Sequence, residues 1–326
     1  MSGQTIVSTA VTHTGPPNIY VGAYPAIRAT LDYGWHRNPT AARQVLQDCI
    51  IHGILSHART PPLSMSTSRA AAGAANTRIR PWLIFTAGAM GVGKSHFLRW
   101  LRREGVVPTD LCVHTDLDAV RRRLPEWPAL VASDTANGTR LAGASTQRES
   151  GLMVEIAQAA ALEQGLPLII DGSLRDVDWW RTFITKLKAS QAATLPPQKR
   201  HRIAIWHVVA SEEVVVRRAA ARAAVTGRAI PRDLLLQTLT QVPLSVAALT
   251  PLVDIVATID TGRDAPAPPL LVGCSAMEEE EAAASGGGST TRGSTKTRAA
   301  ARWAQFGAIF TEGTACFEKG CSGAAL

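Results

Sequence analysis

Three glycines, a lysine and a serine stand at a spacing that binds phosphate groups in many proteins. The stretch from Gly88 to Ser95 reads GAMGVGKS and fits the P-loop pattern G-x-x-x-x-G-K-[ST]. In this pattern the backbone N–H groups cradle a phosphate chain, the lysine reaches the β- and γ-phosphates, and the hydroxyl ligates Mg²⁺. We therefore predict a site for ATP and Mg²⁺ in which Lys94 also takes part in catalysis. The residues expected to contact the nucleotide are Gly88, Gly91, Val92, Gly93, Lys94, Ser95 and His96.

The segments on either side of this loop have the character that the pattern requires. Residues 82–87 are apolar and predict a buried strand, and residues 96–103 predict an amphipathic helix. The alternative is an ordinary glycine turn before a helix, with an exposed lysine. The order strand, glycine loop and helix favours the phosphate site.

Acidic side chains follow two other apolar segments that predict strands. Asp116 and Asp118 come after residues 110–114, and Asp171 lies in the run 166–172. The carboxyl ends of parallel strands meet at one edge of a sheet, so we expect these acids beside the P-loop. There Asp171 and Ser95 would hold Mg²⁺, Asp118 would activate an acceptor hydroxyl, and Asp116 would bind the acceptor. The alternatives are a turn contact for Asp171 and helix capping for Asp118.

Arginines that could stabilise the charge of a transferred phosphate lie in the second half of the chain. The candidates are Arg175, Arg217, Arg218, Arg222 and Arg228. We expect catalytic roles for Arg218 and Arg228, a nucleotide contact for Arg222 and an acceptor contact for Arg175. Helical segments on either side of residues 227–231 predict a lid with a hinge. A solvated helix face is the alternative for most of these arginines.

Strand-like and helical segments alternate along most of the chain, which indicates βαβ units. We predict an α/β fold of the P-loop NTPase type, three layers with a mainly parallel, five-stranded sheet. The strands are expected at 82–87, 110–114, 166–172, 202–209 and 253–259, and helices at 41–57, 149–164, 177–189, 212–226 and 232–239.

Composition divides the chain into five parts. We expect a flexible arm at 1–18, a helical lead-in at 19–57, a linker at 58–79, the P-loop domain at 80–262, and a low-complexity, mostly disordered tail at 263–326. Within the tail, residues 299–310 form a candidate short helix.

The composition also excludes several classes of protein. The five cysteines form no C-x-x-C pair and the histidines show no ligand spacing, so neither a disulfide framework nor a zinc site is indicated. No apolar run reaches 18 residues and no secretory signal is recognisable, so we expect a cytoplasmic protein without a membrane partner. The net charge of +8 would attract nucleic acid, a nucleotide or a phosphorylated sugar.

The order of motifs resembles the zeta toxin family of P-loop kinases, over roughly residues 80–262. After the P-loop come D-x-D-x-x-R at 116–121, Pro125, T-x-x-E at 146–149 and IIDGSLR at 169–175. The sequences LPEW at 124–127 and GRAIP at 227–231, with the WH lead-in from Trp35, are similar to the longer, eukaryotic-type members.

The resemblance implies a P-loop kinase core and assigns roles by position. The bacterial toxins of the family use ATP and Mg²⁺ to phosphorylate a hydroxyl of UDP-N-acetylglucosamine. Asp118 matches the catalytic aspartate and Glu149 a substrate-binding acid, while Asp171 stands where many members have glutamate. Arg218 or Arg222, together with Arg228, match the charge-stabilising arginines. No antitoxin domain is recognisable in the sequence.

These observations together predict a kinase that transfers the γ-phosphoryl group of ATP to a hydroxyl of a small molecule. A kinase for the 5′-hydroxyl of a polynucleotide is a first alternative, which the basic charge would suit, although nucleic acid is not the favoured partner. A regulatory module that binds ATP without transferring phosphate is a second alternative.

Overall fold

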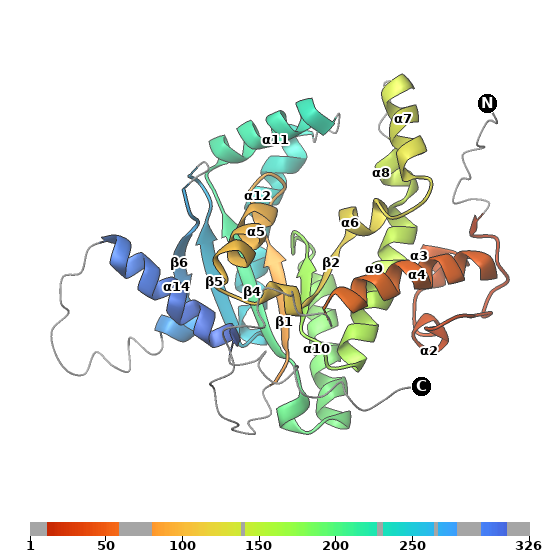
Figure 1. Cartoon of the computed structure of the whole chain (residues 1–326), viewed down its shortest axis with the longest axis horizontal. Coiled ribbons are helices and arrows are strands. Elements are labelled where there is room, and N and C mark those ends of the chain that lie inside the picture. Colours follow the sequence, from red (N-terminus) through yellow and green to blue (C-terminus); the bar gives the residue numbers. More distant parts are fainter. Residues whose placement is uncertain are drawn as a thin grey trace, which may run out of the picture.

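The computed structural model describes residues 12–58, 80–137, 141–226, 231–263, 267–278 and 295–311. Its centre is a sheet with strand order β2-β3-β1-β4-β5-β6 (Figure 1). The strands are β1 (Trp82–Ala87), β2 (Val113–Asp116), β3 (Leu168–Asp171), β4 (Arg202–Val209), β5 (Ile255–Asp260) and β6 (Leu270–Cys274). Neighbouring strands are parallel except β5 and β6, which are antiparallel.

The helices lie around this sheet in the expected three-layer arrangement. They are α2 (Pro25–Arg28), α3 (Tyr33–His36), α4 (Ala41–His57), α5 (Lys94–Glu104), α6 (Leu117–Arg121), α7 (Trp127–Asn137), α8 (Ala142–Ser145), α9 (Gln147–Glu163), α10 (Val177–Thr194), α11 (Glu212–Thr226), α12 (Arg232–Leu249) and α14 (Thr295–Thr311). Short 3₁₀ turns lie at Thr109–Leu111, Pro197–Lys199 and Thr250–Leu252.

β1 is the central strand, and all six of its residues are buried. Its alternate side chains face two separate cores, since Leu83 and Phe85 belong to one cluster and Trp82 and Ile84 to the other. A strand covered on both faces has no polar side, which explains its continuous apolar sequence. Because β1 lies between β3 and β4, the loop that follows it leaves the middle of the sheet.

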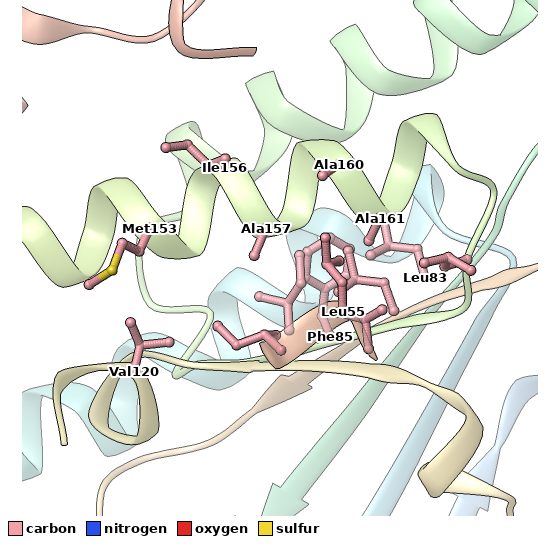
Figure 2. Close-up of a cluster of buried hydrophobic side chains, with 14 of the residues drawn as sticks. Leu55, Leu83, Phe85, Val120, Met153, Ile156, Ala157, Ala160 and Ala161 are labelled. Atoms are coloured by element: carbon pink, nitrogen blue, oxygen red, sulfur yellow. The ribbon is translucent and has the colours of Figure 1, made fainter. Parts of the chain in front are cut away.

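The first core joins α4, α9, α10 and α12 to the face that carries Leu83 and Phe85. Figure 2 shows α9 crossing above this face, with Ala157, Ala160 and Ala161 turned towards Leu83, Phe85 and Leu55 of α4. Small side chains on the helix let it approach the strands closely, and α4 closes the edge of the cluster. The expected lead-in helix therefore shares the core of the P-loop domain.

The second core includes two elements from the segment that the sequence predicts to be a low-complexity tail. β6 adds a sixth strand to the expected five, and α14 buries Trp303, Phe306 and Phe310 in the cluster on the other face. The ring of Phe310 lies 4.7 Å from that of Trp82. β6 was not expected, whereas α14 contains the short helix expected at residues 299–310.

Three further expectations about the elements differ from the structure. The arm is not loose at residues 12–15, since Gly15 N donates to Asn38 O at 2.9 Å. α12 continues to Leu249 because Pro243 is accommodated inside it, whereas we expected the helix to end near 239. The strand expected at 110–114 lies at Val113–Asp116, after a 3₁₀ turn. The linker lies almost entirely outside the described residues.

One described helix, at 232–252, is long and apolar enough to cross a membrane by length and composition. Its side chains Leu235, Val242, Val246 and Leu249 belong to the two cores, so it packs as the core helix of a globular domain does.

Candidate functional site

The loop from Gly88 to Gly93 has a backbone shape that only glycine allows at its ends. Gly88 and Gly93 have φ angles of +150° and +109°. A Cβ atom on Gly88 would lie 2.7 Å from Val208 O, and one on Gly93 would lie 2.8 Å from Thr261 Oγ1. The loop therefore packs so closely against β4 and the residue after β5 that a side chain at either glycine would clash, and its curved shape requires glycine there.

Lys94 begins α5 and turns its ammonium group back to the loop. Nζ donates to Gly88 O at 2.8 Å and to Ala89 O at 3.3 Å. Burial lowers the pKa of this ammonium and the charge of Arg222 adds to the effect, while Asp171, Asp116 and Asp118 oppose it. The charges that surround Lys94 are therefore the acids and the arginine that the sequence singled out.

Asp171 stands at the end of β3, between Thr86 of β1 and Asp116 of β2 in the register of the sheet. Thr86 Oγ1 donates to Asp171 Oδ1 at 2.7 Å, and His114 Nε2 lies 3.8 Å from the other carboxylate oxygen. Burial alone would raise the pKa of Asp171, but His114, Lys94 and Thr86 together hold it below its ordinary value. Asp171 is therefore ionised at neutral pH.

Asp116 and Asp118 have different partners, and this settles which of them caps the helix. Asp116 is the N-cap of α6, because its Oδ1 accepts from Asp118 N at 2.8 Å. The carboxylate of Asp118 accepts from Arg121 Nη1 at 2.6 Å and lies 3.6 Å from Arg222 Nη2 of α11. Asp118 thus sits between two guanidinium groups, one on its own helix and one across the site.

A cavity of about 970 Å³ opens beside Asp116 and Asp171. Ser95, Asp116, Asp171 and His114 line it, and arginines of α5 and of the α6 segment stand on its walls. These arginines are Arg99, Arg102, Arg122 and Arg123. Arg102 is paired with Asp110, and Arg122 lies 4.0 Å from Asp116.

The chemistry of this end of the cavity fits a magnesium ion. Mg²⁺ is usually held by one or two carboxylates together with phosphate oxygens and waters. Ser95, Asp171 and Asp116 supply one hydroxyl and two carboxylates. No group of three or more His, Cys, Asp or Glu side chains arranged for a metal occurs among the described residues, so a metal held by protein ligands alone is not indicated there.

The structure separates the candidate arginines into different surroundings. Arg218 donates to the carbonyls of Val92, at 3.4 Å, and Thr261, at 2.8 Å, so it fastens the P-loop to the segment after β5. The expected contact of Arg218 with the transferred phosphate stays a prediction. Arg222 Nη2 lies 3.6 Å from Asp118, and the side chains of Arg175, Arg217 and Arg222 are exposed. Arg228 lies outside the described residues.

Glu149 does not join the other expected site residues. Its side chain is 1% exposed, and its two oxygens accept from Arg43 Nε at 2.6 Å and Arg43 Nη2 at 2.8 Å. Gln47 also donates to Glu149, at 2.8 Å. The expected contact with substrate is corrected to a buried contact with α4, because the lead-in helix covers this carboxylate.

Sequence reasoning missed several side chains that shape the site. Thr86 and His114 contact the carboxylate of Asp171. Arg121 binds Asp118 itself, and Arg43 binds Glu126 in the segment that follows it. His114 carried a usable signal, since it stands two residues before Asp116 and so shares its face of a strand. Arg43 carried no such signal, because its partners Glu126 and Glu149 are 83 and 106 residues away in the sequence.

Comparison with known proteins gives one family and one similar fold. The sequence model of a family described as Zeta toxin matches residues 68–263. A solved structure from the PezAT chromosomal toxin–antitoxin system of Streptococcus pneumoniae shares 16% identity with a TM-score of 0.51, over 85% of this chain and 98% of that chain.

Two weaker matches have TM-scores too low to inform this chain. A putative kinase from Chloroflexus aurantiacus shares 21% identity with a TM-score of 0.33, over 49% of this chain and 75% of its own. A gluconokinase from Sinorhizobium meliloti shares 19% identity with a TM-score of 0.29, over 57% of this chain and 86% of its own. None of the curated protein sequences matches the chain.

Proposed function

This chain belongs to the zeta toxin family, and on that premise we propose that it is a kinase dependent on ATP and Mg²⁺. It would transfer the γ-phosphoryl group to a hydroxyl of a small molecule. The observation that carries the proposal is the arrangement around Lys94. A glycine loop shaped for phosphate, the ionised Asp171, and Asp118 between two arginines meet at one edge of the sheet.

The P-loop would bind the triphosphate through its backbone N–H groups and through Lys94. The ammonium group of Lys94 would exchange its bonds to Gly88 O and Ala89 O for bonds to phosphate oxygens. Ser95 and Asp171 would hold the Mg²⁺, with Asp116 beside them. When bound, the ion neutralises charge on the phosphate oxygens.

Asp118 would orient the acceptor hydroxyl and take up its proton during transfer. Arg121 fixes the position of the carboxylate, and Arg222 brings a second positive charge to the place where phosphate charge develops. We give Arg218 the role of holding the P-loop in shape, through its bonds to Val92 and Thr261.

The cavity beside Asp116 and Asp171 supports an acceptor that carries phosphate groups. Four arginines stand on its walls, and arginine forks suit phosphate oxygens. A nucleotide sugar such as UDP-N-acetylglucosamine would satisfy this chemistry, with its diphosphate between the walls. The reaction would take place in the cytoplasm, where ATP is plentiful and the cysteines stay reduced.

A polynucleotide with a 5′-hydroxyl is the second candidate acceptor. The net charge of +8 and the same four arginines favour it, because a nucleic acid backbone would release counterions on binding. Binding of this acceptor would weaken steeply as the salt concentration rises, whereas binding of a small nucleotide sugar would weaken less.

The experiment that tests the proposal is phosphate transfer by the purified full-length chain. The protein is incubated with labelled ATP and Mg²⁺, and with a panel of nucleotide sugars and 5′-hydroxyl oligonucleotides. We expect label on a nucleotide sugar. We expect Asp118→Asn to bind ATP as the wild type does and to lose transfer by a factor of about 10²–10⁴, as removal of a general base does.

Three other outcomes would change the conclusion. Label on the oligonucleotides would favour the polynucleotide kinase. ATP binding without transfer to any member of the panel would favour the regulatory module. Unchanged turnover in Asp118→Asn would remove Asp118 from the catalytic role.

A further inference from the structure

We propose that Arg43, on the lead-in helix α4, is a positioning residue for Asp118 and so makes the lead-in a part of the candidate active site. The matched family model begins at residue 68, so Arg43 stands outside it. The structural part of the proposal is independent of any activity. Its catalytic consequence rests on the proposed kinase function.

The first step is the way Arg43 holds two glutamates that come from different segments. Its Nε and Nη2 atoms bond to Glu149 of α9, and its Nη1 and Nη2 atoms donate to Glu126 at 2.6 and 3.1 Å. One guanidinium group therefore makes two bidentate ion pairs, each with both oxygens of a carboxylate. Arg43, Glu126 and Glu149 have side chains 8%, 14% and 1% exposed, so the three charges are shielded from water.

The second step is the balance of charge in this buried group. Burial would lower the pKa of Arg43, but the hydrogen bonds and charges of Glu149 and Glu126 outweigh it and raise the pKa. Without the guanidinium, two carboxylates would face each other in a shielded place, with Gln47 as a donor to one of them. Such a pair would separate or take up a proton, and the segments that carry the two acids would move apart.

The third step connects those segments to Asp118. Arg121 is 1% exposed and bonds to Asp118 Oδ1 and to Gln147 Oε1, each at 2.6 Å. Its guanidinium also lies 5.7 Å from the centre of the Trp127 ring. Trp127 follows Glu126 directly, and Gln147 stands two residues before Glu149. Trp127 and Gln147, which contact Arg121, thus lie within two residues of Glu126 and Glu149, the glutamates that Arg43 binds.

The fourth step is that α4 is itself fixed by buried bonds within the lead-in. Arg28 of α2 is fully buried and bonds to Asp48 at 2.6 Å and to Gln47 at 2.9 Å. His36 of α3 lies 3.1 Å from Glu155 of α9. A chain of polar contacts therefore runs from α2 through α4 to α9 and on to Asp118, and α3 contacts α9 directly. Figure 1 shows these lead-in helices beside α9, next to the β2 edge of the sheet.

The test compares Arg43→Gln with the wild type and with a control on the same helix. Leu55→Ala removes a buried side chain of α4 that is 4% exposed and makes no polar contact, so it reports loss of packing alone. The measurements are kcat, KM for ATP, and amide hydrogen exchange of residues 117–127 and 147–150, all on the full chain. Conditions are chosen so that each variant is fully folded.

We expect Arg43→Gln to speed hydrogen exchange in both segments and to lower kcat on the order of tenfold to a hundredfold, with KM for ATP unchanged. This is the size of loss seen when a partner that orients a functional side chain is removed. Leu55→Ala should leave exchange at 117–127 and kcat close to those of the wild type. Adding Glu149→Gln to Arg43→Gln should recover part of kcat, since it removes one of the two facing charges.

Equal loss of kcat in Arg43→Gln and Leu55→Ala would overturn the positioning role, and so would unchanged exchange at residues 117–127. If Arg43→Gln does not fold, Arg43→Lys gives the same comparison, because a lysine keeps the charge but cannot form two bidentate ion pairs. A wild-type chain that transfers no phosphate would refute the proposed function, and the exchange experiment would still decide whether Arg43 orders the Asp118 segment.

Discussion

At the scale of single residues, the candidate site is a group of charged side chains that interact with one another. Lys94 lies among Asp171, Asp116 and Asp118, and each acid has a further partner on another element. Such coupling means that a substitution changes the surroundings of several groups at once. A clear test therefore measures one defined step, such as nucleotide binding, in a site variant and compares it with the same step in a control variant outside the site.

Lys94→Ala should weaken ATP binding by at least about tenfold, because the loop loses the side-chain cation that we propose to bind the β- and γ-phosphates. Isothermal titration with ATP and Mg²⁺ measures the affinity. Lys186→Ala, at an exposed position on α10, is the matched control and should bind as the wild type does. Unchanged ATP affinity in Lys94→Ala would contradict the central prediction about the P-loop.

At the scale of elements, the part of the chain that behaved least as expected is the tail. α14 packs Phe306 and Phe310 against Trp82 of β1 and Trp206 of β4. Its Trp303 packs against Phe97 and Trp100 of α5. Gly307 belongs to this contact, since a Cβ there would lie 2.5 Å from Val106 O. The helix thus covers the face of the sheet on which α5 also packs, and so supports the helix that begins with Lys94.

Phe306→Ala should lower the free energy of unfolding by about 3–5 kcal/mol, the cost of removing a buried aromatic ring from a packed core. Phe306 is fully buried, whereas Ala304 on the same helix is exposed. Urea unfolding followed by tryptophan fluorescence measures the change, with Ala304→Ser as the control. A loss for Phe306→Ala as small as that for the control would mean that the tail contributes nothing to the core.

At the scale of the whole molecule, buried polar contacts join segments that are far apart in the chain. His201 is an example, because its side chain bonds to Gln191 at the end of α10, at 2.8 Å, and lies 3.1 Å from Leu166 O ahead of β3. Burial is the main cause that lowers the pKa of His201 to about 4. The neutral imidazole is therefore the form that the fold accommodates.

This shift predicts a dependence of stability on pH. The folded pKa lies below the unfolded value of about 6.5, so the contribution of His201 is complete above pH 6.5 and is lost as the pH falls towards 4. The loss is of the order of 3 kcal/mol, at about 1.4 kcal/mol for each unit of pKa shift. Thermal unfolding between pH 7 and pH 4 measures it.

His201→Gln is the comparison for this prediction, because glutamine cannot take up a proton in that range. Its stability should fall less steeply with pH than that of the wild type. Parallel curves for the two proteins would show that His201 keeps its ordinary pKa in the folded state.

The sequence by itself determined the P-loop, the mainly parallel α/β class and the family, because each depends on local spacing. A glycine loop between a strand and a helix, and acids at strand ends, have the same meaning wherever the chain folds. Asp171 and Asp118 were found in this way, and the structure places them near Lys94. Their chemical roles remain predictions.

Only the tertiary structure decided which polar side chains meet across the chain. Arg43 was one polar residue among many on a helix, until the fold brought it to Glu126 and Glu149. The same contacts took Glu149 away from the expected substrate site, and the packing of α14 turned part of a low-complexity tail into core. Contacts between residues a hundred positions apart depend on how elements pack, and no local pattern in the sequence encodes them.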